Sequence, residues 1–230
     1  CSQSRGLGDV YKRQKMNNRK VYISGEIVPE VDAKISIFDS AVLLGDTVTE
    51  STRTFNFKPF KLDEHLERLY KSFKLTRIDP QMTIEEMKKV SLELLEINKD
   101  NYKANEDCWL VHNISRGHSI TGGNPALQVS KPTVMIYTQP MNLVLWAPFY
   151  TKGCHAVTPP TRMVPSQSLD ARIKNRSRLF YTLAEIEAKL VDPDAQSVIL
   201  DIHGNVAENK GGNIFTVSYT HLTLPTNGTV

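Results

Sequence analysis

Alternating apolar and polar positions predict several strands in the first half of the chain. Two short runs on either side of Gly25-Glu26 have the pattern of a hairpin. Further along, Leu110, His112 and Ile114 fall on one face of a run with period two. We expect strands at residues 21–24, 27–28, 34–38, 47–55, 108–115 and 133–138.

Two helices are predicted between these strands. The first has Asp63 as its N-cap, and its apolar residues follow at helical spacing: Leu66, Leu69, Tyr70 and Phe73. The second opens at Thr83 with Glu86 three residues later, which is the spacing of a capping box. Its apolar positions are Met87, Val90, Leu94 and Ile97, and residues 98–107 are expected to form a polar loop.

The second half begins with a crossing segment, residues 140–151, and then shows a new group of elements. We expect strands at residues 155–158, 197–201, 206–207 and 214–217. The helix after Lys174 carries an apolar stripe formed by Leu179, Leu183, Ile186 and Leu190. Strands, then two helices, then more strands predict an α+β fold with two domains, at residues 16–150 and 151–217.

Both ends of the chain differ from the remainder. Residues 1–15 show neither period, and Met16 is the expected start. Residues 218–230 are rich in Thr and Pro and carry no charge. Both segments resemble translated sequencing-adaptor read-through. We therefore expect a non-native leader and tail around a second domain that is truncated, and leave both ends out of the fold prediction.

The leader accounts for the net charge of +3. It holds four cations and one anion, which gives 4 − 1 = +3: Arg5, Lys12, Arg13, Lys15 and Asp9. Residues 16–217 are therefore neutral, and the basic pI gives no support to nucleic-acid binding.

Cysteine usage and hydropathy indicate the compartment. The three cysteines form no Cys-x-x-Cys pair, which argues against disulfides and a zinc site and fits a reducing compartment. The longest apolar run, residues 143–150, is interrupted by Pro148 and is much shorter than the roughly 20 residues that span a bilayer. No signal-peptide core is present at the N-terminus. We expect a cytoplasmic protein without membrane, metal or nucleic-acid partners.

Three groups of polar residues are candidates for chemistry. Lys174 stands among Arg172, Arg176 and Arg178, directly before a predicted helix. Positive charge at a helix start is unfavourable because it opposes the helix dipole, so such a cluster suggests a nearby anion such as phosphate. Glu208 precedes Gly211-Gly212, whose backbone could approach a ligand closely. His65 and Arg68 lie one turn apart. Each group also has a non-functional interpretation. Lys174 could belong to a solvated basic cluster, Glu208 could be an ordinary turn residue, and Arg68 could be exposed and paired with Glu64.

The order of three motifs resembles a known family. They are His65-Leu66-x-Arg68-Leu69, Lys174-Asn175-x-x-Arg178, and Gly204-x-Val206-x-Glu208 followed by Asn213-x-Phe215. Together they resemble the pyridoxal-phosphate enzymes of fold type IV, the class IV aminotransferases. This family includes branched-chain and D-amino-acid aminotransferases and aminodeoxychorismate lyase. The resemblance covers residues 20–217 and implies a homodimer.

The resemblance implies roles for four residues. Lys174 matches the lysine that binds the cofactor aldehyde, and neighbouring cations would lower its pKa. Glu208 matches the glutamate that pairs with the pyridine nitrogen, so that the ring can accept electrons. Arg68 matches the arginine that binds the cofactor phosphate through its planar fork. Asn213, in the motif of Glu208, is also expected at the cofactor.

Residues 43–53 match the family strand that lines the substrate pocket. Leu44 and Val48 would form part of an apolar wall, and Arg53 falls where branched-chain enzymes carry an arginine. The Arg-x-His pair by which D-specific enzymes trap a carboxylate is absent after Gly117, although Arg116 or His118 could replace it. The resemblance thus implies transamination between an amino acid, preferably a branched-chain L-amino acid, and a 2-oxo acid.

Other functions stay open at this point. A D-amino-acid aminotransferase and an aminodeoxychorismate lyase share the fold. A non-catalytic cofactor-binding scaffold, an inactive fragment, or oligonucleotide binding through residues 172–178 are further alternatives. The retained lysine argues against a scaffold, because a protein that only binds the cofactor does not need it. Substrate and stereochemistry are not determined by the sequence.

Overall fold

The computed structural model describes residues 18–103, 106–119, 131–218 and 221–223. The chain divides into two compact units, Cys1–Met141 and Asn142–Val230. This division lies on the N-terminal side of the predicted boundary at 150/151. Each unit is described by itself below.

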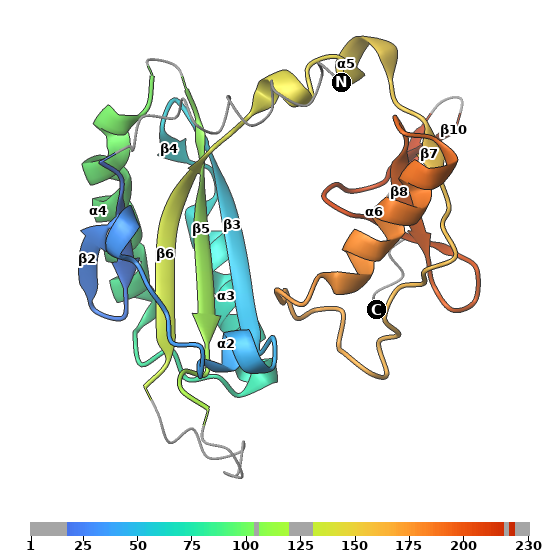
Figure 1. Cartoon of the computed structure of the whole chain (residues 1–230). Helices are drawn as coiled ribbons and strands as arrows, with labels where there is room; N and C mark the ends of the chain where they lie inside the picture. The colour runs from blue at the N-terminus through green and yellow to red at the C-terminus, as the bar shows by residue number, and fades with distance from the viewer. Residues whose placement is uncertain (1–17, 104–105, 120–130, 219–220, 224–230) are drawn as a thin grey trace, which may run out of the picture. The chain divides into compact units, whose positions relative to one another are not determined.

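Unit 1 is built on a sheet of antiparallel strands in the order β2-β1-β6-β5-β3-β4. Two helices, α3 (Leu62–Thr76) and α4 (Ile84–Asn98), cover one face of this sheet (Figure 1). The strands are β1 (Lys20–Ile23), β2 (Glu26–Pro29), β3 (Thr47–Phe55), β4 (Lys58–Pro59), β5 (Cys108–Ser115) and β6 (Thr133–Pro140). Three short helical turns complete the unit: η1 (Glu30–Asp32), α2 (Ser40–Leu43) and η2 (Lys99–Asn101).

The strand predictions for this unit are confirmed with one exception. The hairpin and the strands β3 and β5 lie where the period-two pattern indicated. The predicted strand at residues 34–38 is wrong, since this segment lies in no strand and Ile37 is 69% exposed. Alternation alone predicted that strand, but no neighbouring strand pairs with the segment.

The first helix begins before its predicted N-cap. Its N-cap residue is Lys61, in the left-handed region with φ 54°, and Asp63 lies in the first turn. Leu62 is buried and belongs to the core, so burial of this side chain brings the first turn into the helix. The capping box of α4 is confirmed, because the Thr83 side chain and Glu86 bond each other's backbone N–H groups.

Most of the expected core positions of unit 1 are buried between the helices and the sheet. On α4, Met87 and Leu94 are fully buried, whereas Ile97, the last of its apolar positions at helical spacing, is 42% exposed. Asn98 is buried instead, and its amide exchanges hydrogen bonds of 2.7 and 2.9 Å with the backbone of Lys20. These hydrogen bonds to β1 place the Asn98 side of the last helical turn toward the inside of the unit.

Unit 2 contains α6 (Leu179–Val191) and a small sheet in the order β7-β8-β9. β8 (Gln196–Leu200) is parallel to β7 (Ala156–Val157) and antiparallel to β9 (Val206–Asn209). A second pair joins β10 (Thr216–Ser218) to β11 (His221–Thr223), so described residues within the predicted tail are paired. The turns η3 (Leu143–Leu145) and α5 (Phe149–Lys152) precede these elements.

The helix α6 is buried on an unexpected face. Tyr181, Ala184 and Ala188 are its buried residues. The predicted apolar stripe is exposed, with fractions of 73% for Leu179, 46% for Leu183, 53% for Ile186 and 82% for Leu190. The spacing located the helix correctly, but the face marked by the apolar stripe is not the buried face within the described chain. Among the described residues, no helix is long and apolar enough to cross a membrane.

Candidate active site

Arg68 lies on α3 and is bound to a buried carboxylate of β3. Its Nε donates to Glu50 Oε2 at 2.7 Å, and its Nη2 donates to Glu50 Oε1 at 2.6 Å. The Glu50 side chain has no exposed surface, whereas half of the Arg68 side chain is exposed. The alternative pairing with Glu64 is not formed, since Glu64 pairs with Lys61 at 3.0 Å. Arg68 is therefore a fixed cation at the surface of unit 1.

Glu50 stays ionised although it is buried. Burial alone would raise the pKa of its carboxyl, but hydrogen bonds from His65 and Arg68 and the charge of Arg68 lower this pKa to about 2. Its neighbour across the sheet, His112, is fully buried, and burial lowers the pKa of His112 to about 4. The His112 ring lies 2.8 Å from the Ser91 hydroxyl through Nε2. Under the helices, unit 1 thus holds a negative carboxylate and a neutral histidine.

Lys174 lies in the segment between β7 and α6. It is half-buried, and the helix begins only at Leu179, so of the four clustered cations only Arg178 lies at the helix start, where it is the N-cap residue. Arg172 is paired with Asp170 at 2.6 Å and is 71% exposed. Its charge is therefore compensated by Asp170, which weakens the expectation that Arg172 acts on Lys174.

Glu208 lies on β9 and is bound to α6. The Tyr181 hydroxyl donates a hydrogen bond to Glu208 Oε2, and burial together with this bond raises the pKa of Tyr181. The Arg178 guanidinium lies 4.3 Å from the centre of the Tyr181 ring and donates to the backbone carbonyl of Lys210. The start of α6 therefore holds both the carboxylate and the turn that follows β9.

The turn after Glu208 does not require its glycines for space. Gly211 N–H donates to Asn209 Oδ1 at 3.0 Å, so the turn is closed by an asparagine side chain. A Cβ at Gly211 would meet nothing within 4 Å, and one at Gly212 would meet only Asn209 Oδ1 at 3.7 Å. The space beside both glycines is open within the described chain, and a close approach of this backbone to a ligand stays a prediction. Asn213 follows in the loop and is exposed.

The substrate-pocket candidates of the first unit lie in different environments. Val48 is 1% exposed and packs in the core, because alternation along β3 directs it to the same side as Glu50. It is therefore left out of the proposed pocket. Leu44 is 69% exposed at the end of α2. Arg53 lies with its guanidinium carbon 4.2 Å from the centre of the Phe55 ring, a cation–π contact.

Arg116 and His118 follow β5. Arg116 pairs with Asp46 at 2.8 Å and donates to the backbone carbonyls of Thr76 and Arg77 at 3.0 and 2.8 Å. It thereby ties the end of α3 to the start of β3, a structural use that competes with carboxylate binding. His118 is exposed, and its ring centre lies 5.8 Å from that of Phe38.

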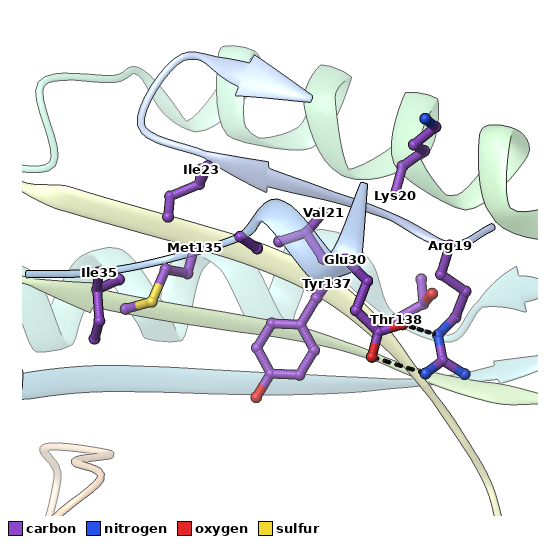
Figure 2. A pocket seen from close by; sticks show the side chains of 10 residues that line it. Arg19, Lys20, Val21, Ile23, Glu30, Ile35, Met135, Tyr137 and Thr138 are labelled. Carbon is purple, nitrogen blue, oxygen red and sulfur yellow. Dashed lines mark hydrogen bonds and ion pairs between the residues drawn. The ribbon is translucent and has the colours of Figure 1, made fainter. Parts of the chain in front are cut away.

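A cavity of about 240 Å³ lies elsewhere in unit 1. Figure 2 shows Tyr137 and Met135 of β6 on the cavity side, with Ile35 beside Met135 and the Arg19–Glu30 pair at one end. None of the predicted site residues lines it. The lining residues are Arg19, Lys20, Val21, Ile23, Glu30, Ala33, Ile35, Met135, Tyr137 and Thr138.

Two residues that hold candidate side chains are not indicated by the sequence motifs. One is Glu50 in unit 1, since a glutamate in a β-rich run is usually solvent-facing, although its place in the alternation puts it on the same face as the buried Val48. The other is Tyr181 in unit 2, which lies on the face of α6 opposite the apolar stripe.

Comparison with known proteins identifies the family. The family profile described as Amino-transferase class IV matches residues 47–230. A putative branched-chain-amino-acid aminotransferase of Methanocaldococcus jannaschii is 36% identical over 206 residues, which is 90% of this chain and 68% of that protein. The chain belongs to the class IV aminotransferase family, so the predicted family and its transaminase class are confirmed.

Two further comparisons bear on fold and substrate. A T.th. branched-chain amino acid aminotransferase, solved with pyridoxamine 5′-phosphate, superposes with a TM-score of 0.78 at 25% identity, over 90% of this chain and 68% of that one. This likeness confirms the predicted fold class. A D-alanine aminotransferase of Staphylococcus epidermidis is 32% identical over 120 residues, 52% of this chain and 41% of that protein.

Proposed function

We propose that this chain carries the cofactor lysine of a pyridoxal-phosphate-dependent aminotransferase. The observation that carries the proposal is the presence of Lys174, Glu208 and Arg68 in the family's motif order, within a chain that belongs to the family. The reaction moves an amino group from an amino acid to a 2-oxo acid. The chain spans about two thirds of the length of the Methanocaldococcus relative, so the activity is proposed for the whole protein.

The described residues fit pyridoxal 5′-phosphate in their chemistry. Arg68 offers Nη1, which makes no hydrogen bond to any residue that the structure describes. Glu208 uses Oε2 for Tyr181, and its Oε1 has no hydrogen-bond partner within the described part of the chain. The cofactor needs three matching groups. Arg68 offers an N–H edge for its phosphate, Glu208 offers a carboxylate oxygen for its ring nitrogen, and Lys174 offers an amine for its aldehyde.

Each residue has a defined task in the proposed reaction. The cofactor, when bound, supplies a ring that accepts the electrons released as the substrate loses its α-proton. Glu208 would accept a charge-assisted hydrogen bond from the protonated ring nitrogen. Lys174 would hold the aldehyde, and its amine, when free, would move the proton at Cα. Arg68 would hold the phosphate, and Asn213 is proposed as a further contact.

The proposed substrates are branched-chain L-amino acids. Support comes from the names of the relatives and from Arg53, at the position where branched-chain enzymes carry an arginine. Leu44 contributes an apolar surface, and Arg116 and His118 are the proposed polar contacts for the carboxylate. D-amino-acid transamination is the second candidate, because the Staphylococcus D-alanine aminotransferase matches half of the chain.

Cofactor binding tests the proposal directly. Pyridoxal 5′-phosphate added to the chain should give the absorption band of a lysine-bound aldehyde, and Lys174→Ala should abolish it. Lys189→Ala, an exposed lysine of α6, is the matched control and should leave the band unchanged. A band of equal strength in Lys174→Ala would contradict the proposal, and a bound cofactor without any lysine band would favour the scaffold alternative.

Substrate choice is tested by product analysis. Incubation with 2-oxoglutarate and either L-leucine or D-alanine should yield glutamate from L-leucine. Glutamate from D-alanine alone would assign the D-specific reaction. Release of pyruvate from aminodeoxychorismate without an amino acceptor would assign the lyase.

We further propose a cytoplasmic homodimer. The family resemblance supports the dimer. The three scattered cysteines, without a Cys-x-x-Cys pair, fit a reducing compartment. Sedimentation equilibrium should give twice the mass of one chain, and a monomer at all concentrations would contradict the dimer.

A further inference from the structure

Glu50 is a buried charge that the proposed chemistry does not use. Its side chain has no exposed surface, and it lies near the middle of β3. Burying a carboxylate is costly unless it is paired and fully hydrogen-bonded. The structure supplies such partners, and most of them come from α3.

The partners of Glu50 fix the plane of one guanidinium. Two hydrogen bonds, at 2.7 and 2.6 Å, join its two oxygens to Nε and Nη2 of Arg68. His65 Nδ1 lies 3.1 Å from Oε1, and the backbone N–H of Ser51 donates to the same oxygen at 2.9 Å. Because an ionised carboxylate only accepts, Nδ1 of His65 carries the proton and donates.

This pairing decides which edge of Arg68 can meet a ligand. The edge with Nε is occupied by Glu50, while Nη1 makes no hydrogen bond to any described residue and half of the side chain is exposed. A guanidinium held in this way loses little conformational freedom when an anion binds. The remaining edge, formed by Nη1 and the second N–H of Nη2, is therefore held in one plane and can donate two hydrogen bonds to an anion.

We propose that Glu50 is a positioning residue that fixes Arg68 for the phosphate group of the cofactor. The inference rests on the proposed function, in which Arg68 binds that phosphate. Glu50 does not touch the ligand, because its side chain has no exposed surface. Its effect on binding is therefore confined to ligands that carry a phosphate.

A purely structural ion pair would behave differently. Apolar residues of similar volume often hold two elements together as well as a buried ion pair does. If Glu50 only attached α3 to β3, its loss would weaken the fold and reduce the binding of every ligand alike. A ligand pair that differs only in the phosphate therefore separates the two roles.

The test compares pyridoxal 5′-phosphate with pyridoxal on the full chain. Both have the ring and the aldehyde, and only the first has the phosphate. Glu50→Gln should weaken binding of pyridoxal 5′-phosphate about tenfold or more and change binding of pyridoxal less than about twofold. Glu67→Gln, an exposed neighbour of Arg68 on α3, is the matched control and should change neither.

A double-mutant cycle links the effect to Arg68. In an Arg68→Ala background, Glu50→Gln should cause no further loss of affinity for pyridoxal 5′-phosphate. Equal weakening of both ligands, or unchanged binding of the phosphate form, would overturn the inference. Pyridoxal that gives the lysine band equally in Lys174→Ala would refute the proposed function instead.

A second variant covers the case in which Glu50→Gln fails to fold. Glu50→Asp keeps the charge but is one methylene shorter, so it cannot reach both Nε and Nη2 of Arg68. The same difference between the two ligands is expected for this variant. Loss of both ligands to the same extent would overturn the inference here as well.

Discussion

The two units bury their apolar residues in opposite ways. In unit 1 the large side chains predicted from the pattern are inside, and Leu66, Leu69 and Leu94 have no exposed surface. In unit 2 the large aliphatic side chains of α6 are outside, and Tyr181 and the small residues Ala184 and Ala188 are the buried ones. The same kind of apolar spacing thus leads to a large core in one unit and an exposed stripe in the other.

The difference shows what an apolar stripe does and does not predict. A helix that carries apolar residues on more than one face is typical of a buried position in a large protein. Periodicity finds such a helix but cannot rank its faces, because each face has a helical period. In unit 2 the choice of Tyr181 and the alanines is associated with the hydrogen bond to Glu208 and with close packing on β8.

The largest expected effect is that of truncating the core of unit 1. Leu66→Ala should lower the free energy of unfolding of unit 1 by about 2–5 kcal/mol, because it leaves a cavity at a fully buried site. Leu183→Ala, the same truncation on the exposed stripe of α6, should change stability by less than about 0.5 kcal/mol. Hydrogen exchange of amides in each unit measures both effects, and equal losses would break the comparison.

Acid should weaken unit 1 through His112. The pKa of this histidine is about 4 in the folded chain and 6.5 ordinarily, because burial disfavours its charged form. Between these values the unfolded chain binds a proton that the folded chain does not, so stability falls as pH falls. The expected loss from pH 7 to pH 5 is about 2 kcal/mol, measured by urea unfolding.

A neutral substitution provides the control for this pH effect. His112→Asn should remove the pH dependence between 7 and 5, even if the variant is less stable throughout. Glu50, with a pKa of about 2 against an ordinary 4.5, contributes stability that is lost only at lower pH. An unchanged slope in His112→Asn would show that another group titrates on folding.

Enlarging the buried face of α6 should have a moderate effect. Ala184→Leu adds volume at a site with no exposed surface and should cost about 1–3 kcal/mol. Hydrogen exchange in α6 and β8 measures the loss. If Ala184→Leu were neutral while Leu183→Ala were destabilising, the stripe and not the alanine face would pack on the sheet.

The smallest predicted effect is at the start of α4. Thr83→Ala removes the side-chain acceptor for the Glu86 N–H and should destabilise unit 1 by about 1 kcal/mol. Thermal unfolding of unit 1 provides the measurement. Thr83→Ser keeps the acceptor and should stay close to the parent, and equal losses in both variants would contradict the capping role.

Much of unit 1 was predictable because its local signals agree. The capping box, the turn residues and the period-two strands each act over a few positions, so they can be identified without knowledge of the fold. The prediction of a strand at residues 34–38 is wrong because alternation alone does not make a strand, which also needs a neighbouring strand to pair with. The exposure of Ile97 does not follow from its spacing, because Asn98, hydrogen-bonded to β1, takes the buried side of the last turn.

The sequence by itself determined the family, the order of the elements and the residues proposed to hold the cofactor. Those features depend on short motifs and local periods, which can be recognised in the linear sequence without knowledge of the fold. Tertiary structure alone decided that Glu50 holds Arg68, that Tyr181 holds Glu208 and that Val48 belongs to the core. The reason is physical: each of these contacts joins residues on different elements, and their distances are fixed only once the sheet and helices have packed.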